Sequence, residues 1–550
     1  MLNKKNIELL KGIEPGQMTK GEQSMLLSLV ELLMQKVNEQ GALIQELRDD
    51  INRLKGEQGK PNISGKNQKE RESKLGDISS EKERKQKSRH RKRRVKFDSS
   101  RRIDVTKKTD IADKSSLPAD IVFKGYAKTH YQHLEINTQL IELQRAIYYS
   151  PSRNQTYTAN YPNDYKSGDY SQDLKGHIIM LKSKFGMSIP QIGEFLRQNG
   201  IDITNGTISN IYISIGQSLK AESDLIHKKG IENGLYSQTD STGSRVNGEN
   251  HHSHIFTNAY FTSYFTTKHK DRQTVLDLLR SEVPRVYLLD ETTYAIYAYL
   301  KIPKNIQQFL STLKLKTVLN QVDFEAQIKG VLAEQDYLRH QAKVLEGAYL
   351  AAYQADTPVT ILVADDAPQY KLCALSIALC WVHIGRNFKK INPTIKHHQT
   401  LLEVFLNQFW IFYHRLKDYK QNPEPLIARQ LQADFDTIFS QKTGFELLNQ
   451  QIAKVKAKKR ELLVVLTHPY VPLHNNDAEL AARKEIRYRD ISFQTRTQRG
   501  TQAKNTFFTI IQTAQKLGLN SYEYILDRIK RKSTMLSLDK FVLEKMKIDF

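Results

Sequence analysis

Three short stretches of the chain place acidic side chains at the ends of predicted elements. "GLYSQTDSTG" is typical of a strand that ends on Asp240, and "VTILVADDAPQY" of a buried central strand with Asp365 and Asp366 at its C-terminal end. "HNNDAELAARKE" places Glu479 just after a polar Asn-Asn-Asp turn. Glu479 and Arg483 are four residues apart, so a surface ion pair on a helix is the alternative interpretation.

Three carboxylates held close together repel one another and raise each other's pKa unless a cation neutralises them. Mg²⁺ or Mn²⁺ would suit such a site, because hard cations take oxygen ligands. Two such ions would activate a water or a 3′-hydroxyl and stabilise the leaving oxygen during in-line phosphodiester cleavage. We therefore expect Asp240, Asp365 and Glu479 to be the catalytic residues and the metal ligands of an enzyme that cuts and joins DNA.

The elements that must position these residues follow a recognisable order. After the first strand, "SHIFTNAYFTSYFTT" predicts two antiparallel strands, and "RQTVLDLLRSEV" predicts a helix before the parallel strand that ends at Asp365. This is the order of an α/β, ribonuclease-H-like core with a mixed sheet. The pattern is helical again from about Val382 to Val465, which predicts a helical insertion before Glu479.

The local sequence favours Asp365 over Asp366 as the metal ligand. Asp366 and Gln369 have capping-box spacing, so Asp366 is expected to cap a helix that continues through "KLCALSIALC". Asp365 would then be free to point over the edge of the sheet, where ligands of open α/β sheets gather.

The N-terminal region shows two different patterns. Apolar residues from Leu26 to Leu54 repeat every seven positions, which predicts a coiled coil within residues 1–56; a packed globular helix is the alternative. Residues 57–116 are nearly free of large apolar side chains and include "KERKQKSRHRKRRVKF". We expect a disordered basic linker that contacts phosphates, or a tether that only aids solubility.

Residues 117–230 are expected to be helical. "SIPQIGEFLRQNG" and "ITNGTISNIYISIG" form two helices with a short Gly-containing turn, which is the helix-turn-helix pattern. A plain three-helix packing unit is the alternative. In the DNA-binding interpretation, base contacts come from the outward residues of the second helix, namely Asn205, Thr207 and Asn210.

The composition narrows the class of partner. A formal net charge of +23 favours a polyanion, and DNA or RNA is the expected partner. There is no run of about 18 apolar residues and no signal-peptide pattern, so we expect no membrane association and a cytoplasmic location. The two cysteines exclude a disulfide scaffold and a zinc site of four thiolates.

Four blocks resemble the signature segments of the insertion-sequence-66 family of DDE transposases: "LVADDAPQY", "CWVHIGRNF", "PLHNNDAELAAR" and "RDISFQTRTQRGTQAKNTFFTIIQTAQKLG". The resemblance runs from about Phe185 to Arg528, and it implies that Asp240, Asp365 and Glu479 match the family's catalytic triad. Two features depart from the family pattern. Ser241 stands where Glu is frequent, and the cysteine-rich zinc module that precedes the helix-turn-helix in many members is missing.

Other residues belong to these blocks or compete with them. "VYLLDETTY" offers Asp290 and Glu291 as an alternative first acid, which we reject because no hairpin follows it. Cys380 and His383 are three apart, and one such pair cannot complete a zinc site alone, so a structural role in seating the insertion is expected. Expected motif residues are His474, Asn475, Asn476 and Asp366, and a phosphate track is expected from Arg483, Arg487, Arg489, Arg496 and Arg499.

The whole pattern predicts a transposase that binds the ends of its own element, cleaves there and joins the 3′-hydroxyl to target DNA. It would act as a homo-oligomer, with possible accessory proteins of the element. A stand-alone nuclease of the same fold and a dimeric DNA-binding regulator are the alternatives. The expected segments are a coiled coil at 1–56, a linker at 57–116, a helix-turn-helix domain at 117–230, the core at 231–381, the insertion at 382–470 and the core completion at 471–550.

Overall fold

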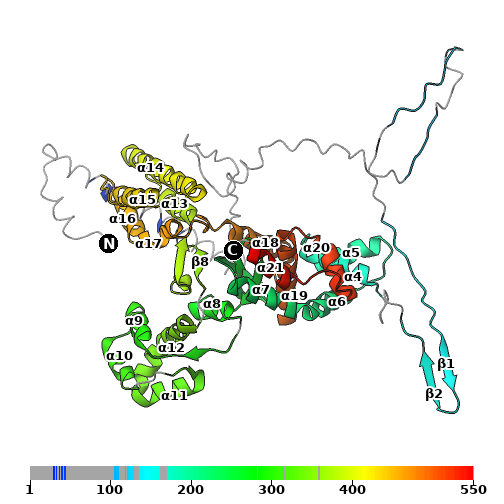
Figure 1. Ribbon diagram of the computed structural model, residues 1–550, viewed down its shortest axis with the longest axis horizontal. Helices are drawn as coiled ribbons and strands as arrows, with labels where there is room; N and C mark the ends of the chain where they lie inside the picture. Colours follow the sequence, from blue (N-terminus) through cyan, green and yellow to red (C-terminus); the bar gives the residue numbers. More distant parts are fainter. Residues whose placement is uncertain are drawn as a thin grey trace.

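The computed structural model describes most of the chain from residue 136 onwards. The continuous described ranges are 105–110, 120–128, 136–161, 170–281, 283–313, 317–356 and 359–548. Within them the protein is a mixed α/β structure with a five-stranded mixed sheet and many helices (Figure 1).

The predicted coiled coil and basic linker lie almost entirely outside the described residues. Nine positions between Leu26 and Ile44 are described, and all nine are helical. The apolar side chains among them include Leu26, Val30 and Leu33, which are exposed. Of the linker at 57–116, only residues 105–110 are described, and they form neither helix nor strand. The coiled coil therefore stays a prediction.

A group of helices precedes the sheet, but the prediction that residues 117–230 are helical is wrong for the first part of that range: the described residues between 117 and 171 contain a β-hairpin and no helix, because Ile147–Ser150 pairs with Gln155–Thr158. Ser188 and Gln191 form the expected capping box, and the first helix of the group is followed by Gly186 at a φ of +84°, a backbone conformation that glycine adopts readily. The helices are α4 (Gln172–Ser183), α5 (Ile189–Gln198), α6 (Asn205–Ser218) and α7 (Lys220–Glu232).

The central sheet has the strand order β5-β4-β3-β8-β9. Its first three strands are antiparallel neighbours, and β8 and β9 run parallel to β3 and to each other. The predicted order of three antiparallel strands, a helix and a parallel strand is therefore confirmed. The bounds are β3 (Ser237–Val246), β4 (Glu249–Thr257), β5 (Thr262–Thr267), α8 (Arg272–Leu279), β8 (Ile361–Ala364) and β9 (Ser376–Leu379).

Two local predictions are wrong. Strand β3 does not end on Asp240 but continues to Val246, because the polar residues after Asp240 pair with β4. The segment "KLCALSIALC" is not a helix: a short 3₁₀ turn, η2 (Pro368–Tyr370), is followed by β9. A short apolar run fits a buried strand as well as a helix, and pairing with β8 decides the outcome here.

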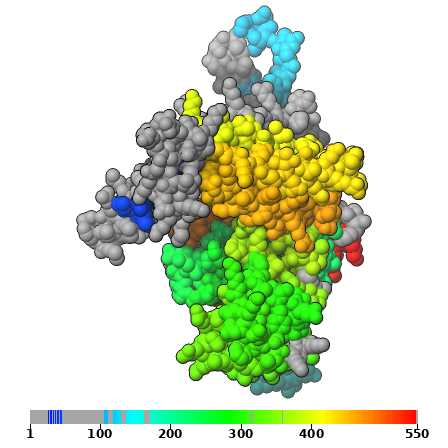
Figure 2. Space-filling view, turned by 90° about the vertical axis from the view of Figure 1, so that its left-hand side faces the viewer, coloured from blue at the N-terminus to red at the C-terminus, as the bar shows by residue number. Residues whose placement is uncertain are grey.

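Two helical insertions interrupt the sheet and lie apart in Figures 1 and 2, where the first is green and the second yellow to orange. The first lies between α8 and β8; the second lies between β9 and the helix that carries Glu479, so the stretch 382–470 is helical as predicted. The first contains β6 (Val286–Tyr287), α9 (Glu291–Tyr299), α10 (Lys304–Ser311), β7 (Leu319–Asn320), α11 (Gln321–Val331) and α12 (Glu334–Asp356). The second contains α13 (Trp381–Lys389), α14 (Lys396–Gln421), α15 (Pro425–Ile438), α16 (Glu446–Lys456), α17 (Lys459–Leu462) and η3 (Val464–Leu466).

The C-terminal helices pack on the sheet and on the helices that precede it. Tyr264 and Phe508 pack against each other between β5 and this helical layer. In the described part of the chain no helix is both long and apolar enough to cross a membrane. The helices are α18 (Asn476–Ser492), α19 (Gln498–Lys516), α20 (Ser521–Lys530) and α21 (Leu538–Ile548), and a separate hairpin of β1 (Ile147–Ser150) and β2 (Gln155–Thr158) precedes all of them.

Trp381 joins the second insertion to the core. Its side chain is fully buried, and its indole N–H donates to the backbone oxygen of Leu462 at 3.0 Å. Its backbone N–H donates to the oxygen of Leu473 at 2.9 Å, just before the helix that carries Glu479. Four aromatic rings surround it, those of Phe409, Phe412, Phe435 and Phe439.

We predict that Trp381→Ala lowers the free energy of unfolding by about 3–5 kcal/mol, because it leaves a cavity among these rings and an unpaired carbonyl. Urea unfolding followed by circular dichroism measures this change. Ile411→Ala is the matched control, since Ile411 lies on α14 with 59% of its surface exposed and its truncation should change stability by less than about 0.5 kcal/mol. Equal effects of the two substitutions would contradict the structural role of Trp381.

Candidate active site

The pairing of β3 with β8 brings the two predicted aspartates to the same place on the sheet. In this parallel pair Ser237 lies opposite Leu362, and Gln238 lies opposite Val363. Continuing the register by two residues sets Asp240 opposite Asp365, which directly follows β8. Neighbouring strands are about 4.8 Å apart, so the two carboxylates share one side of the sheet.

The polar turn before α18 is hydrogen-bonded to β3. The Asn475 side-chain amide donates to the Thr239 carbonyl at 2.6 Å. Gln238 makes two bonds with Asp477: its Nε2 donates to the carboxylate at 3.0 Å, and its Oε1 accepts from the backbone N–H at 3.3 Å. Because side chains alternate along a strand, Gln238 and Asp240 face the same side, toward α18. The turn therefore brings Glu479, two residues beyond Asp477, to the two aspartates.

Glu479 lies between α18 and α13. Its Oε1 is 3.6 Å from His383 Nδ1, and its Oε2 is 3.5 Å from Arg386 Nη2. The carboxylate is only 17% exposed. Beside it a cavity of about 360 Å³ is lined by Asp365, His383 and Lys390, among others. The site is thus open to a ligand on the side of α13.

The other two carboxylates act electrostatically on Asp240. Burial, first, and then the charges of Asp365 and Glu479 raise the pKa of Asp240 to about 7, against the opposing effect of the hydrogen bond from the Ser241 N–H. A carboxyl group in this state binds a proton or a cation in preference to remaining a bare anion. Asp240, Asp365 and Glu479 therefore fit a divalent cation with oxygen ligands, as expected from the sequence.

Asp366 does not cap a helix, contrary to the prediction. The 3₁₀ turn after it has Ala367 as its N-cap, without a side-chain cap. Asp366 instead forms ion pairs with Lys371 at 3.0 Å and with Lys458. Burial raises its pKa, but the hydrogen bonds and charges of the two lysines outweigh burial and lower it. The carboxylate that accepts a backbone N–H here is Asp365, from Ala367 at 3.2 Å.

The rejected alternative, Asp290, has a local structural role. It is the N-cap of α9 and forms a capping box with Thr293, whose backbone N–H donates to the carboxylate at 2.8 Å. Its oxygens are therefore engaged with the helix start.

Cys380 and His383 lie at the start of α13, with Cys380 as its N-cap. Cys380 is buried, and its sulfur accepts the Asn475 backbone N–H at 3.3 Å. Asn475 and Asn476 are buried as well, and His474 is half-buried in the same turn. Five of the six motif residues, all except Asp366, thus lie near the Glu479 end of α18.

The predicted DNA-contacting residues lie on α6, on α18 beyond Glu479, and along the segment from α18 into α19. Asn205 and Asn210 are exposed on α6, whereas Thr207 is half-buried and bonds to the N-cap residue Thr204. Beyond Glu479, Arg487, Arg496 and Arg499 are exposed and Arg483 is half-buried. Arg489 donates to the Gly243 carbonyl at 2.5 Å and so also serves to hold α18 against β3.

Sequence reasoning missed two residues near the carboxylates. Arg386 lies one turn after His383 on α13, and this i, i+3 spacing within "CWVHIGRNF" is a signal that could have identified it. The buried Tyr370 lies close enough to Asp240 and Asp365 that their charges, after burial, raise its pKa to about 12.

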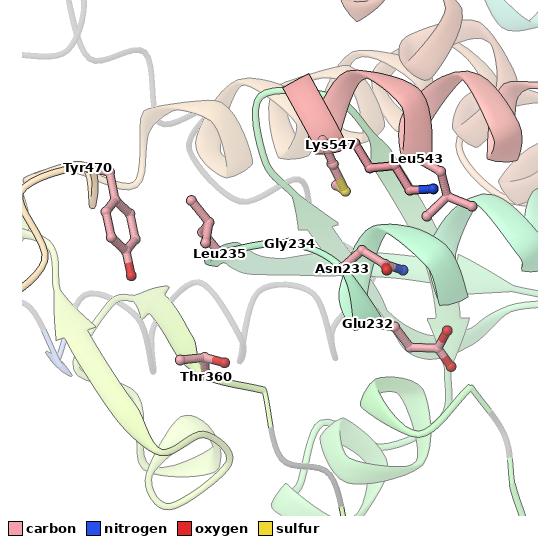
Figure 3. A pocket seen from close by; sticks show the side chains of 9 residues that line it. Glu232, Asn233, Gly234, Leu235, Thr360, Tyr470, Leu543 and Lys547 are labelled. Carbon is pink, nitrogen blue, oxygen red and sulfur yellow. The ribbon is translucent and has the colours of Figure 1, made fainter. Parts of the chain in front are cut away.

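Another pocket, of about 380 Å³, lies at the opposite end of the parallel strands (Figure 3). Leu235 precedes β3 and Thr360 precedes β8, so these residues mark the amino-terminal ends of the strands. Lys547 of α21 and Glu232 of α7 also line it, but none of the three carboxylates does. We therefore place the candidate site at the carboxylates.

The pH dependence of stability should report the burial of Asp240 beside the other two carboxylates. The folded-state pKa of Asp240, about 7, lies above its ordinary value of 3.8, so protonation favours the folded chain. This stabilisation is fully present below pH 3.8 and is lost as the pH rises through about 7. Asp240→Asn cannot ionise and should raise the free energy of unfolding of the metal-free protein at about pH 8 by on the order of 3 kcal/mol.

Thermal unfolding of wild type and Asp240→Asn across this pH range checks the prediction. The difference in stability between Asp240→Asn and wild type should become smaller as the pH falls. Mg²⁺ should stabilise the wild type more than the variant. A variant less stable than wild type at alkaline pH would show that Asp240 is not crowded by other carboxylates.

The chain is similar to a known protein family and to a bacterial protein. Residues 338–503 match the family model of the Transposase IS66 family, a range that includes Asp365, His383 and Glu479 but begins after Asp240. The chain is also 29% identical, over 303 residues, to the "Uncharacterized protein y4jO" of Sinorhizobium fredii (strain NBRC 101917 / NGR234). That alignment covers 54% of this chain and 93% of the relative. The similarity to the transposase IS66 family is thus shown for residues 338–503, which contain the second and third of the predicted acids.

Proposed function

We propose that this protein is a DDE-type transposase with a ribonuclease-H-like core that cleaves the ends of its own mobile element and joins the freed 3′-hydroxyl to target DNA. The observation that carries the proposal is the convergence of three carboxylates from separate elements: β3 pairs with β8 in the register that sets Asp240 beside Asp365, and the charges of Asp365 and Glu479 act on the pKa of Asp240. The family match supports the same assignment.

The residues of the site have distinct proposed roles. Asp240, Asp365 and Glu479 would hold two Mg²⁺ or Mn²⁺ ions. Such a pair would activate a water or a 3′-hydroxyl and neutralise the charge on the leaving oxygen. Arg386 and Lys390, on the α13 side of the site, supply positive charge toward an incoming phosphodiester. Asp366 holds the loop after β8 through its two lysines.

DNA binding is assigned to surfaces away from the carboxylates. The exposed start of α6, with Asn205 and Asn210, suits base contacts in the helix-turn-helix interpretation. The exposed Arg487, Arg496 and Arg499 suit phosphate contacts along the path from α18 to α19. The net charge of +23 supports both assignments, since a polyanion is attracted to such a chain at long range.

We predict that Asp240→Asn and Glu479→Gln each reduce Mg²⁺-dependent cleavage of element ends by more than about 1,000-fold, the order of loss when one member of a catalytic set is removed. End binding should stay near the wild-type level, because the proposed DNA contacts are made by other side chains, on α6 and along the path from α18 to α19. Cleavage is measured on labelled end DNA, and binding by electrophoretic mobility shift.

Asp290→Asn is the matched control, since Asp290 caps α9 and should affect stability by only about 1 kcal/mol. Loss of cleavage in Asp290→Asn together with retention in Asp240→Asn would reverse the choice of first aspartate. A transposase would give products in which the end DNA is joined to a target plasmid, whereas a nuclease would cut without joining. Binding without cleavage in the wild type would favour a DNA-binding regulator.

We predict that deletion of residues 1–56 lowers the oligomeric state and impairs complexes of two DNA ends more than complexes of one end. Joining requires two ends to be held together, and the exposed apolar side chains of Leu26, Val30 and Leu33 need a partner helix. Light scattering gives the mass. A mass reduced only by the deleted residues would remove the proposed role of this segment in assembly.

A further inference from the structure

Three different ligand atoms meet beside the carboxylates. The sulfur of Cys380, an imidazole nitrogen of His383 and a carboxylate oxygen of Glu479 all lie within 4.8 Å of one another. Two come from the start of α13 and the third from α18. Glu479 Oε1 and His383 Nδ1 are buried atoms with no hydrogen-bond partner in the described part of the chain. The group is therefore arranged for an occupant that satisfies these atoms.

The surroundings of Cys380 favour a metal-bound thiolate. Its side chain is 1% exposed, and the Asn475 backbone N–H points at the sulfur from 3.3 Å. Burial raises the pKa of the thiol to about 11, whereas the backbone N–H groups of His383 and Asn475 act in the opposite direction and favour the anion. A cation that binds the sulfur replaces its proton, which is released to solvent.

The ligand types select the metal. Sulfur and imidazole ligands suit Zn²⁺, whereas Mg²⁺ and Mn²⁺ prefer oxygen. We propose that Cys380, His383 and Glu479 form a Zn²⁺ site that competes with the catalytic cation for Glu479. Bonds of 2.0–2.3 Å in a tetrahedron require ligand atoms about 3.3–3.8 Å apart, so side-chain rotation closes the site. The fourth position faces the cavity lined by Asp365.

Glu479 has to leave its present contact to bind either cation fully. Its Oε2 faces Arg386, whose side chain is 41% exposed and has room to turn into solvent. When the Glu479 carboxylate turns toward Cys380 and His383, it moves away from Asp240 and Asp365. Zinc then holds the protein in a form that does not cleave. This inhibition rests on the proposed function, but the binding of zinc does not.

The binding test uses Co²⁺ as a spectroscopic substitute for Zn²⁺ on full-length protein freed of metal with a chelator. Wild type should bind one Co²⁺ with a thiolate-to-cobalt charge-transfer band, and Zn²⁺ should abolish the band. Cys380→Ser should lose the band. His383→Ala, at a more exposed position, should weaken Co²⁺ binding by more than about 100-fold, because loss of even an outer-shell partner costs 10- to 100-fold.

Cys373→Ser is the matched control, because Cys373 is also a buried free cysteine but is not part of this group. It should keep the wild-type band. Circular dichroism tests whether each variant is folded. If Cys380→Ser does not fold, the Co²⁺ affinity of His383→Ala tests the site instead. Absence of the band in wild type, or an equal band in Cys380→Ser, overturns the site.

The activity test compares Mg²⁺-dependent cleavage with and without micromolar Zn²⁺ for each variant. Zinc should inhibit wild type and Cys373→Ser at least 10-fold more than it inhibits His383→Ala, on the order of the loss in affinity. A cobalt band without zinc inhibition overturns the competition for Glu479. Failure of wild type to cleave in Mg²⁺ alone refutes the proposed function and leaves the cobalt result to stand by itself.

Discussion

The candidate site depends on the contact between the Asn475–Asn476–Asp477 turn and strand β3. Gln238 and Thr239 together make three hydrogen bonds to this turn, across more than 230 residues of sequence. Each bond contributes only about 1 kcal/mol net, but losing one leaves a buried polar group unpaired at a cost of about 1–3 kcal/mol. The hydrogen bonds therefore fix the position of the turn along β3. A shift of the turn by one residue would displace Glu479 and leave the Thr239 carbonyl and the Asn475 amide without partners.

A buried ion pair extends this contact along α18. Lys504 of α19 and Glu485 of α18 are each 1% exposed and 2.5 Å apart, and Ser244 of β3 donates to the same carboxylate at 3.2 Å. Lys182 of α4 donates to Ser492 at the end of α18 and lies 4.6 Å above the ring of Tyr488. Removing one partner of a buried ion pair lowers stability by much more than the intact pair contributes to it, because the other charge is left buried and unpaired. The helix with the third carboxylate is thus fixed to the sheet and to the first helix of the preceding helical group.

Local sequence signals predicted local structure well and long-range contacts poorly. The capping box of Ser188 and Gln191 and the hairpin of β4 and β5 depend on neighbouring residues, and both are present. The sequence predicts a helix where strand β9 lies, because a four-residue strand with three apolar residues has no distinctive period, and pairing with β8 determines its state. The ion pair of Asp366 with Lys458 joins residues that are 92 positions apart, and the sequence around Asp366 does not predict it. Three acids could be chosen from sequence, but the contacts that orient them could not.

The position of the second insertion sets the order in which the site can be assembled. Strand β8 and Asp365 leave the ribosome more than 100 residues before Glu479, and the bond between Gln238 and Asp477 spans 239 residues. Such non-local contacts form late, after the loop-closure entropy of the intervening chain has been overcome. A nascent chain therefore contains both aspartates before Glu479 has been synthesised. Synthesis of the C-terminal helices completes the candidate site last, so that the three acids come together only in finished molecules.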